Sequence, residues 1–351
     1  MDLIKGTACL LMVLAHVRFA AAPWLAEATM ASVLFFASTG MNLVGIVERG
    51  RGDEWRLAAN ALFLIFAGFA DNYVQGTLWQ ADVFQSAGMA MLAMLLLRRL
   101  LPRAWTWLFP LPFLIHFANQ HLYWKVAAGG VSSFFLAPGL FPLLPWLSFY
   151  LLGAHLKKYG GLRQGWAIGS AAILGLGVYL TFQPFVFDKW WMSIDYFLIA
   201  CTLAGWSFAA LRRYLPRWRP PLREVRRWGA NSLVFYILHM FVIRALELFI
   251  PHGLGLFLLA VAGTALLLRP ALQLQSWALR QRPAWILLGG GLTAAAVVLA
   301  NATLLAPLVV PRTLASFGVT FSFIAAYPAW KNLSKRLRRA PQPARRASAL
   351  A

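Results

Sequence analysis

The sequence predicts an all-α protein, a polytopic transmembrane bundle of about ten to twelve membrane-spanning helices. Hydrophobic residues fill 60% of the 351 positions and charged residues only 12%, and the mean hydropathy is +0.65. Soluble proteins carry roughly 45–50% apolar and about 25% charged residues. The apolar residues also lie in long blocks, and about 20 of them in a helix cross a hydrocarbon core of roughly 30 Å. We therefore expect one transmembrane domain over residues 1–330 and a basic, disordered cytoplasmic tail over 331–351.

Twelve apolar blocks are predicted to span the membrane. No internal repeat, heptad pattern or Gly/Ser linker divides them, which favours one bundle. In chain order the predicted spans are residues 3–20, 28–47, 57–74, 82–97, 104–122, 139–156, 165–183, 193–211, 229–248, 253–268, 284–304 and 313–330.

The basic residues predict the orientation of these spans. Lys5, every second connector and the tail hold 27 of the 32 Lys and Arg residues, whereas the other connectors hold five. Because cytoplasmic loops are rich in Lys and Arg, both termini are expected in the cytoplasm, as in a multi-pass protein of the inner membrane. A nucleic-acid-binding protein would gather its basic residues on one folded face. We therefore attribute the net charge of +21 to basic residues that set the membrane topology, and nucleic acid is not expected as a partner.

The first block, "DLIKGTACLLMVLAHVR" (residues 2–18), resembles a signal peptide in its lysine and apolar run. His16 and Arg18 interrupt it, and a second apolar block follows closely, so we expect a retained first span. Lys5 and His16 are eleven residues apart, which places them about 16 Å apart on one face of a helix. Polar side chains at membrane depth usually face the interior of a bundle or a cavity. His16 is therefore a candidate catalytic residue, or else a core histidine bonded to a neighbouring helix.

A second polar stripe lies in "GANSLVFYILHMFVIR", residues 229–244. Ser232, Tyr236 and His239 follow at spacings of four and three residues, which is one helical face. This helix also enters from the cytoplasmic side, so His239 lies about 15 Å deep, level with His16. Equal depth predicts that the two histidines share one cavity. A polar contact between helices is the alternative.

The remaining polar residues suggest no further site. Cys9 and Cys201 are expected to be packing residues, and the spacing of His116 and His121 does not suit a metal pair on one helical face, so no metal is predicted. Gly153, in "FPLLPWLSFYLLGAHLKK", is expected to allow close helix approach. Loop or interfacial positions account for the rest, namely His155, Arg244, Glu247 and His252.

Taken in order, these segments resemble the membrane acyltransferase type 3 superfamily. Lys5 and His16 match its basic residue and histidine in the first helix, and "SVLFFASTGMNLV" (32–44) is similar to its second-helix segment. "NSLVFYILH" (231–239) resembles its late Ser…Tyr…His helix. Residues 141–156, and more loosely "LWQADVFQSAGMAML" (78–92), are closer to bacterial relatives of the heparan-α-glucosaminide N-acetyltransferase catalytic domain. The last three predicted spans carry no match.

The resemblance implies an acetyl-CoA-dependent acyltransferase that modifies a sugar hydroxyl or amine of a cell-envelope glycan or lipid-linked saccharide. It implies His16 as the catalytic base or acyl carrier, Lys5 near the entry of CoA, and less defined catalytic roles for Tyr236 and His239, with Ser232 in cofactor binding. Acyl-CoA, the glycan acceptor and membrane lipid are the expected partners. The acceptor, the acyl chain and the oligomeric state stay open. The rival hypothesis is a transporter or flippase with a buried histidine and carboxylate relay.

Overall fold

The structure of the chain is a computed structural model. It describes residues 2–17, 19, 22, 30–47, 51–75, 77, 79–121, 130–136, 140–218, 222–280, 322, 326–327 and 329–330. Every element assigned within these ranges is a helix, which confirms the all-α prediction for this part of the chain. The elements are α1 (Asp2–His16), α3 (Ala31–Val47), α4 (Arg51–Gln75), α5 (Val83–Leu100), η1 (Trp105–Leu108), α6 (Leu111–His121), η2 (Gly130–Phe134), α7 (Leu143–Lys158), α8 (Leu162–Leu180), α9 (Ile194–Trp218), α10 (Arg223–Ala230), α11 (Ser232–Leu246) and α12 (Leu254–Arg280).

Several helices are long and apolar enough to cross a membrane. Among the described residues these are α5, the segment Ile194–Tyr214 of α9 and the segment Leu254–Trp277 of α12. The pair α10 and α11 meets the same criteria together, although the two helices are bent by 97°. The coarse prediction of a multi-pass membrane protein is therefore consistent with the helices.

Three predicted spans differ from the helices that form. Residues 104–122 do not make one helix, because Pro110 separates η1 from α6 and proline disfavours helix at the residue before it. Residues 229–248 are divided at Asn231. The span 253–268 is too short, since α12 continues through Pro270 to Arg280. Predicted spans 284–304 and 313–330 lie outside the described residues, apart from five positions near Trp330, and so does the tail 331–351.

The core forms where α3 crosses α7 with almost no space between backbones. A Cβ atom on Gly40 would lie 1.9 Å from the carbonyl oxygen of Tyr150, and one on Gly153 would lie 1.9 Å from that of Ala37. The expected role of Gly153 in close approach is confirmed. Small residues permit such contacts between membrane helices, where dispersion replaces the hydrophobic effect as the attraction. Beside the crossing, the rings of Phe36 and Tyr150 stack with centroids 4.7 Å apart.

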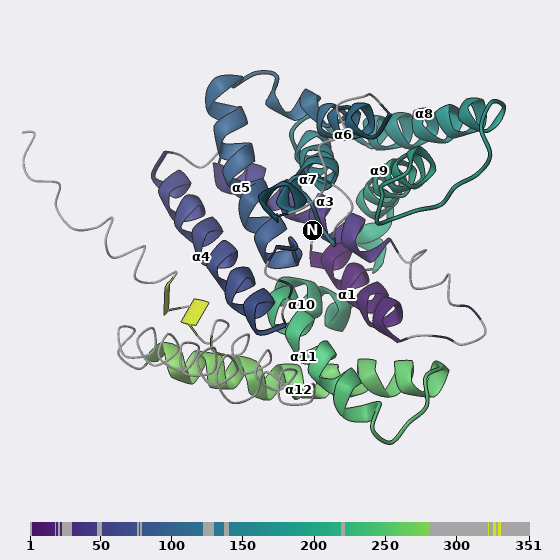
Figure 1. Ribbon diagram of the computed structural model, residues 1–351. Helices are drawn as coiled ribbons and strands as arrows, with labels where there is room; N and C mark the ends of the chain where they lie inside the picture. Colours follow the sequence, from purple (N-terminus) through teal and green to yellow (C-terminus); the bar gives the residue numbers. More distant parts are fainter. Residues whose placement is uncertain are drawn as a thin grey trace, which may run out of the picture.

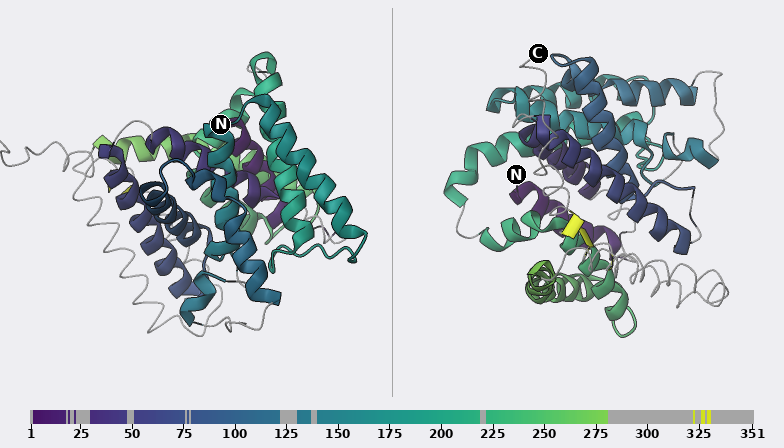
Figure 2. Two further views of the ribbon diagram at one scale, coloured as in Figure 1. Left: turned by 90° about the horizontal axis from the view of Figure 1, so that it is seen from above. Right: turned by 90° about the vertical axis from the view of Figure 1, so that its left-hand side faces the viewer.

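The helices are arranged around this core in pairs. Figure 1 shows α8 beside α9 on one side and α4 beside α5 on the other. The long helix α12 runs along one edge, where it packs on α11, and α1 lies between this edge and α3. Figure 2 shows the same edge position of α12 from a second side. Helix α1 therefore has partners on several sides, which puts its polar residues inside the bundle.

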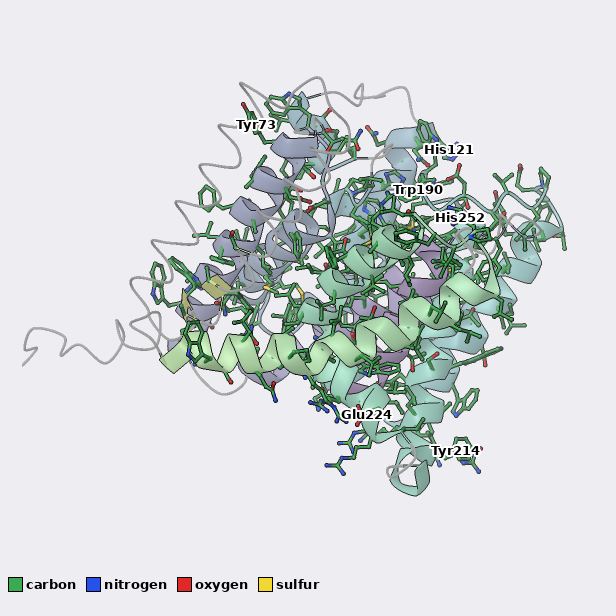
Figure 3. The ribbon with its side chains drawn as sticks, turned by 90° about the horizontal axis from the view of Figure 1, so that it is seen from below. Tyr73, His121, Trp190, Tyr214, Glu224 and His252 are labelled. Carbon is green, nitrogen blue, oxygen red and sulfur yellow. The ribbon has the colours of Figure 1, made fainter. Side chains whose placement is uncertain are left out.

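Alternate connectors gather at opposite ends of the molecule. In Figure 3, Tyr73, His121, Trp190 and His252 lie toward one end, and Tyr214 and Glu224 lie toward the other. The first four lie in or directly beside connectors poor in Lys and Arg, and the last two lie in a basic connector between predicted spans. This separation agrees with the alternation predicted from the charges. We call the two ends the basic-poor end and the basic end.

The α3–α7 crossing yields a matched test on one helix. Gly40→Ala should destabilise the protein by about 1–3 kcal/mol, because its methyl group has no space. Gly45→Ala is the control, since a Cβ there meets nothing within 4 Å and alanine is the better helix former. Thermal unfolding in detergent checks both variants. Equal melting temperatures would contradict the close crossing.

Candidate functional site

The candidate site begins where α1 crosses α10 at two glycines. A Cβ atom on Gly6 would lie 1.9 Å from the carbonyl oxygen of Val225, and one on Gly229 would lie 1.7 Å from that of Asp2. Any side chain at either position would push the helices apart. This contact fixes the start of α1 against the end of α10, directly before α11 begins.

Asn231 separates α10 from α11. Its side-chain amide donates a hydrogen bond of 2.9 Å to the carbonyl oxygen of Arg227, which is in the last turn of α10. Its own carbonyl oxygen accepts the first hydrogen bond of α11, from the N–H of Phe235 at 3.0 Å. The chain turns by 97° here, and α11 then runs alongside α1.

The two helices bring His16 and His239 into contact. His239 Nε2 lies 3.3 Å from His16 Nδ1, and the ring centroids are 5.1 Å apart with the planes 61° from parallel. His239 is fully buried and His16 is partly buried. The two residues are thus in contact across the helices, which is the alternative that the sequence left open, although they are 223 positions apart in the chain.

Neighbouring carbonyl groups define which ring nitrogens carry protons. His16 Nδ1 lies 2.8 Å from the carbonyl oxygen of Met12, and His239 Nδ1 lies 3.3 Å from that of Phe235. A carbonyl oxygen only accepts, so both Nδ1 atoms donate, and neutral rings then carry lone pairs on Nε2. His16 thus shares its Nδ1 proton between Met12 and His239. Its Nε2 atom remains as a base.

A first cavity, which we call the Lys5 cavity, has a volume of about 380 Å³. Lys5, Thr39, Ser232 and Tyr236 are among its lining residues, so three of the five sequence-predicted site residues meet there. The Lys5 ammonium lies 5.9 Å from the centroid of the Phe35 ring, which also lines the cavity. Apolar side chains of α4 and α5 complete the wall. The cavity is thus mainly apolar with a few polar groups at defined positions.

A second cavity, the His16 cavity, has a volume of about 240 Å³ and lies on the other side of the histidine pair. His16 lines it together with Arg244, Glu247 and His252. Lys5 lines the first cavity and not the second, and His239 lines neither, so the two histidines share neither of these cavities. The side chains instead form a row between two cavities, because the Tyr236 ring lies 5.5 Å from the His239 ring.

The charged residues of the His16 cavity are those that the sequence assigned to loops. Arg244 pairs with Glu247 at 3.1 Å, and His252 Nε2 lies 3.9 Å from the Glu247 carboxylate. The charges of Arg244 and Glu247 act on the His16 ring, as does that of Lys189. Glu247 follows His239 by eight residues, about two turns, which is close to the same helical face, whereas Arg244 follows it by five. The spacing of Glu247 was a signal in the sequence, but it does not reveal that α1 ends opposite these residues.

The other histidines stand apart from this pair. His116 is buried and its Nε2 donates to the carbonyl oxygen of Trp191 at 2.9 Å. His155 is buried too, with its ring 4.3 Å from that of Trp107. Within the described residues, no group of three or more His, Cys, Asp or Glu side chains is placed to hold a metal ion.

Comparison with known proteins gives no relative: no family model, curated protein or solved structure matches the chain.

Chemical labelling of histidines can test the arrangement of the pair. Diethyl pyrocarbonate should modify His16, whose Nε2 carries a free lone pair at a cavity, and spare the fully buried His239. We expect His239 to react at least about tenfold more slowly, because its modification requires local opening. Peptide mass spectrometry measures both rates. His252, whose side chain is 43% exposed, is the positive control, and similar rates at His16 and His239 would rule out the arrangement.

Proposed function

We propose that the chain is an integral-membrane acyltransferase that moves an acyl group, typically acetyl, from cytoplasmic acyl-CoA to a sugar hydroxyl or amine of a cell-envelope glycan or lipid-linked saccharide. It resides in the inner membrane with about ten to twelve spans and both termini in the cytoplasm. The basic end then faces the cytoplasm and the basic-poor end faces outward. Resemblance to the membrane acyltransferase type 3 superfamily and the geometry of the candidate site support this proposal independently.

The histidine pair between two cavities is the observation that carries the proposal. The Lys5 cavity is lined by Lys5, by the start of α11 and by the α3 residue Thr39, all within segments that carry the resemblance. The His16 cavity is lined by the outward end of α11 and by His252. One substrate can thus approach Tyr236 from the cytoplasmic side, while the other approaches His16 from outside.

The pair can supply the acid–base chemistry of acyl transfer. His16 Nε2 accepts the proton of the acceptor hydroxyl or amine while that atom attacks the thioester carbonyl carbon. The carbon–sulfur bond then breaks, and the thiolate of CoA receives a proton. An imidazole with an unperturbed pKa near 6.5 is suited to both steps, and His239 Nε2 can take the Nδ1 proton of His16 when that ring is charged. In the alternative route His16 forms an acyl-imidazole, which the acceptor resolves.

A proton-coupled transporter is the second candidate, and one observation favours it. A row of Tyr236, His239 and His16 between two cavities is also a route for protons. The broken helix formed by α10 and α11 is a feature of many transporters as well. Those proteins usually carry two related halves with paired broken helices, and the sequence has no internal repeat. We therefore place transport second.

Acetyl transfer by the purified protein is the primary test. With radiolabelled acetyl-CoA, wild-type protein should release CoA or transfer label, and His16→Ala should lower the rate by about 100-fold or more, because a general base contributes at least that factor. His121→Ala, at the end of α6 and away from both cavities, is the matched control. Equal rates for wild type and His16→Ala would remove His16 from the mechanism.

Proton flux separates the two candidate functions. In the absence of acyl-CoA and acceptor, a pH-sensitive dye inside proteoliposomes should report no proton movement under a pH gradient, because an acyltransferase moves no proton without turnover. Gradient-driven acidification that His16→Ala abolishes would favour the transporter.

Lys5→Ala tests the side from which acyl-CoA enters. Loss of one charged hydrogen-bond donor should raise KM for acetyl-CoA about tenfold and leave kcat nearly unchanged. Lys157→Ala removes an exposed lysine from the end of α7 and serves as the control. The same acetyl-CoA dependence in Lys5→Ala and wild type would contradict this role.

A further inference from the structure

The start of α11 has three backbone donors without acceptors. The first hydrogen bond within this helix is made by the N–H of Phe235, so the N–H groups of Ser232, Leu233 and Val234 precede it. No described residue accepts a hydrogen bond from them. A side chain at the N-cap normally satisfies such groups. Here the N-cap residue Asn231 makes no such bond, because its amide donates to Arg227 of α10 instead.

These open donors face a cavity and not another helix. Residues 230–234 all line the Lys5 cavity. The partial positive charge at the N-terminus of a helix, together with its free N–H groups, favours the binding of anions. Lys5 adds a formal positive charge to the same cavity.

The Ser232 hydroxyl is the second, independent sign of a ligand. Ser232 is 7% exposed, lines the cavity, and makes no side-chain hydrogen bond to any described residue. The hydroxyl oxygen opens to the cavity, so a molecule in the cavity has to supply its hydrogen-bond partner. An oxyanion at the α11 N-terminus would accept hydrogen bonds from this hydroxyl and from the backbone N–H groups together.

We propose that the N-terminus of α11 and the Ser232 hydroxyl form a binding site for a phosphate-class oxyanion within the Lys5 cavity. As the source we assign the diphosphate of acyl-CoA, an assignment that rests on the proposed function. The thioester end would then extend from the α11 N-terminus toward Tyr236 and the histidine pair. Phospholipid headgroups offer the same chemistry and are distinguished below.

Asn231→Asp tests the oxyanion site most directly, because it adds a negative charge at the N-terminus of α11. An aspartate at the N-cap places a carboxylate on the open N–H groups, so it occupies the site from within and repels an anion. Because aspartate is a favourable N-cap, the fold should be kept, and an unchanged or raised melting temperature checks this. Asn231→Ala is the matched control, since it removes the bond to Arg227 but adds no charge. Ser276→Ala, at an exposed serine of α12, is the control for Ser232→Ala.

The experiment uses the full chain in lipid nanodiscs and inorganic pyrophosphate as the probe, with binding measured by calorimetry. Asn231→Asp should weaken pyrophosphate binding about tenfold or more relative to Asn231→Ala, Ser232→Ala should weaken it about threefold to tenfold relative to wild type, and Ser276→Ala should bind as wild type does. Wild-type affinity in a folded Asn231→Asp protein would overturn the site, and so would the absence of pyrophosphate binding by wild type.

Competition identifies the source of the oxyanion. Coenzyme A should displace pyrophosphate, whereas pantetheine, which lacks phosphate, should not. Displacement by phosphatidylglycerol vesicles but not by coenzyme A would overturn the assignment to acyl-CoA. Pyrophosphate binding without any acetyl transfer would leave the oxyanion site in place and remove the proposed function. Acetyl transfer that is equally efficient in Asn231→Asp and wild type would keep the proposed function and remove the oxyanion site.

Discussion

The contact of Gly6 with Gly229 is the constraint on which the candidate site depends. With no side chain on either residue, the backbones of α1 and α10 touch, and the relative height of the two segments is fixed. His16 follows Gly6 by ten residues and His239 follows Gly229 by ten. The same spacing after a shared contact brings the histidines together despite the turn at Asn231. A larger residue at either glycine would change the distance between the rings as well as the helix packing.

Most helix positions and the equal depth of the two histidines could be predicted from the sequence because both depend on local patterns. Apolar blocks give helices, and two histidines at one depth in helices of one orientation are candidates for contact. The role of Gly153 in close helix approach could also be predicted, since a small residue within an apolar helix is typical of a close crossing. These inferences need the rise per residue and the charge of the connectors, but no knowledge of which helices are neighbours.

The remaining features depend on neighbours and were therefore missed. Arg269 continues α12 beyond its predicted end, and its partner Glu224, 3.6 Å away, belongs to α10. Arg244, Glu247 and His252 line a cavity with His16 only because α1 ends opposite them. The division at Asn231 carried a local signal, since asparagine followed by serine is typical of helix ends. The predicted span began at Gly229, two residues before Asn231, because Gly229 and Ala230 were counted with the apolar run that follows.

The distance along the chain between the two histidines has a consequence for biosynthesis. His16 leaves the ribosome 223 residues before His239. At about 5–20 residues per second, the first helix waits roughly 10 to 45 s for its partner. During that interval α3 and α7 can already pair, because both are complete by residue 158. The newly made α1 must therefore be retained beside an unfinished bundle, with its imidazole lacking its later partner. The site is thus among the last parts of the described fold to assemble, although one of its halves is the first to be made.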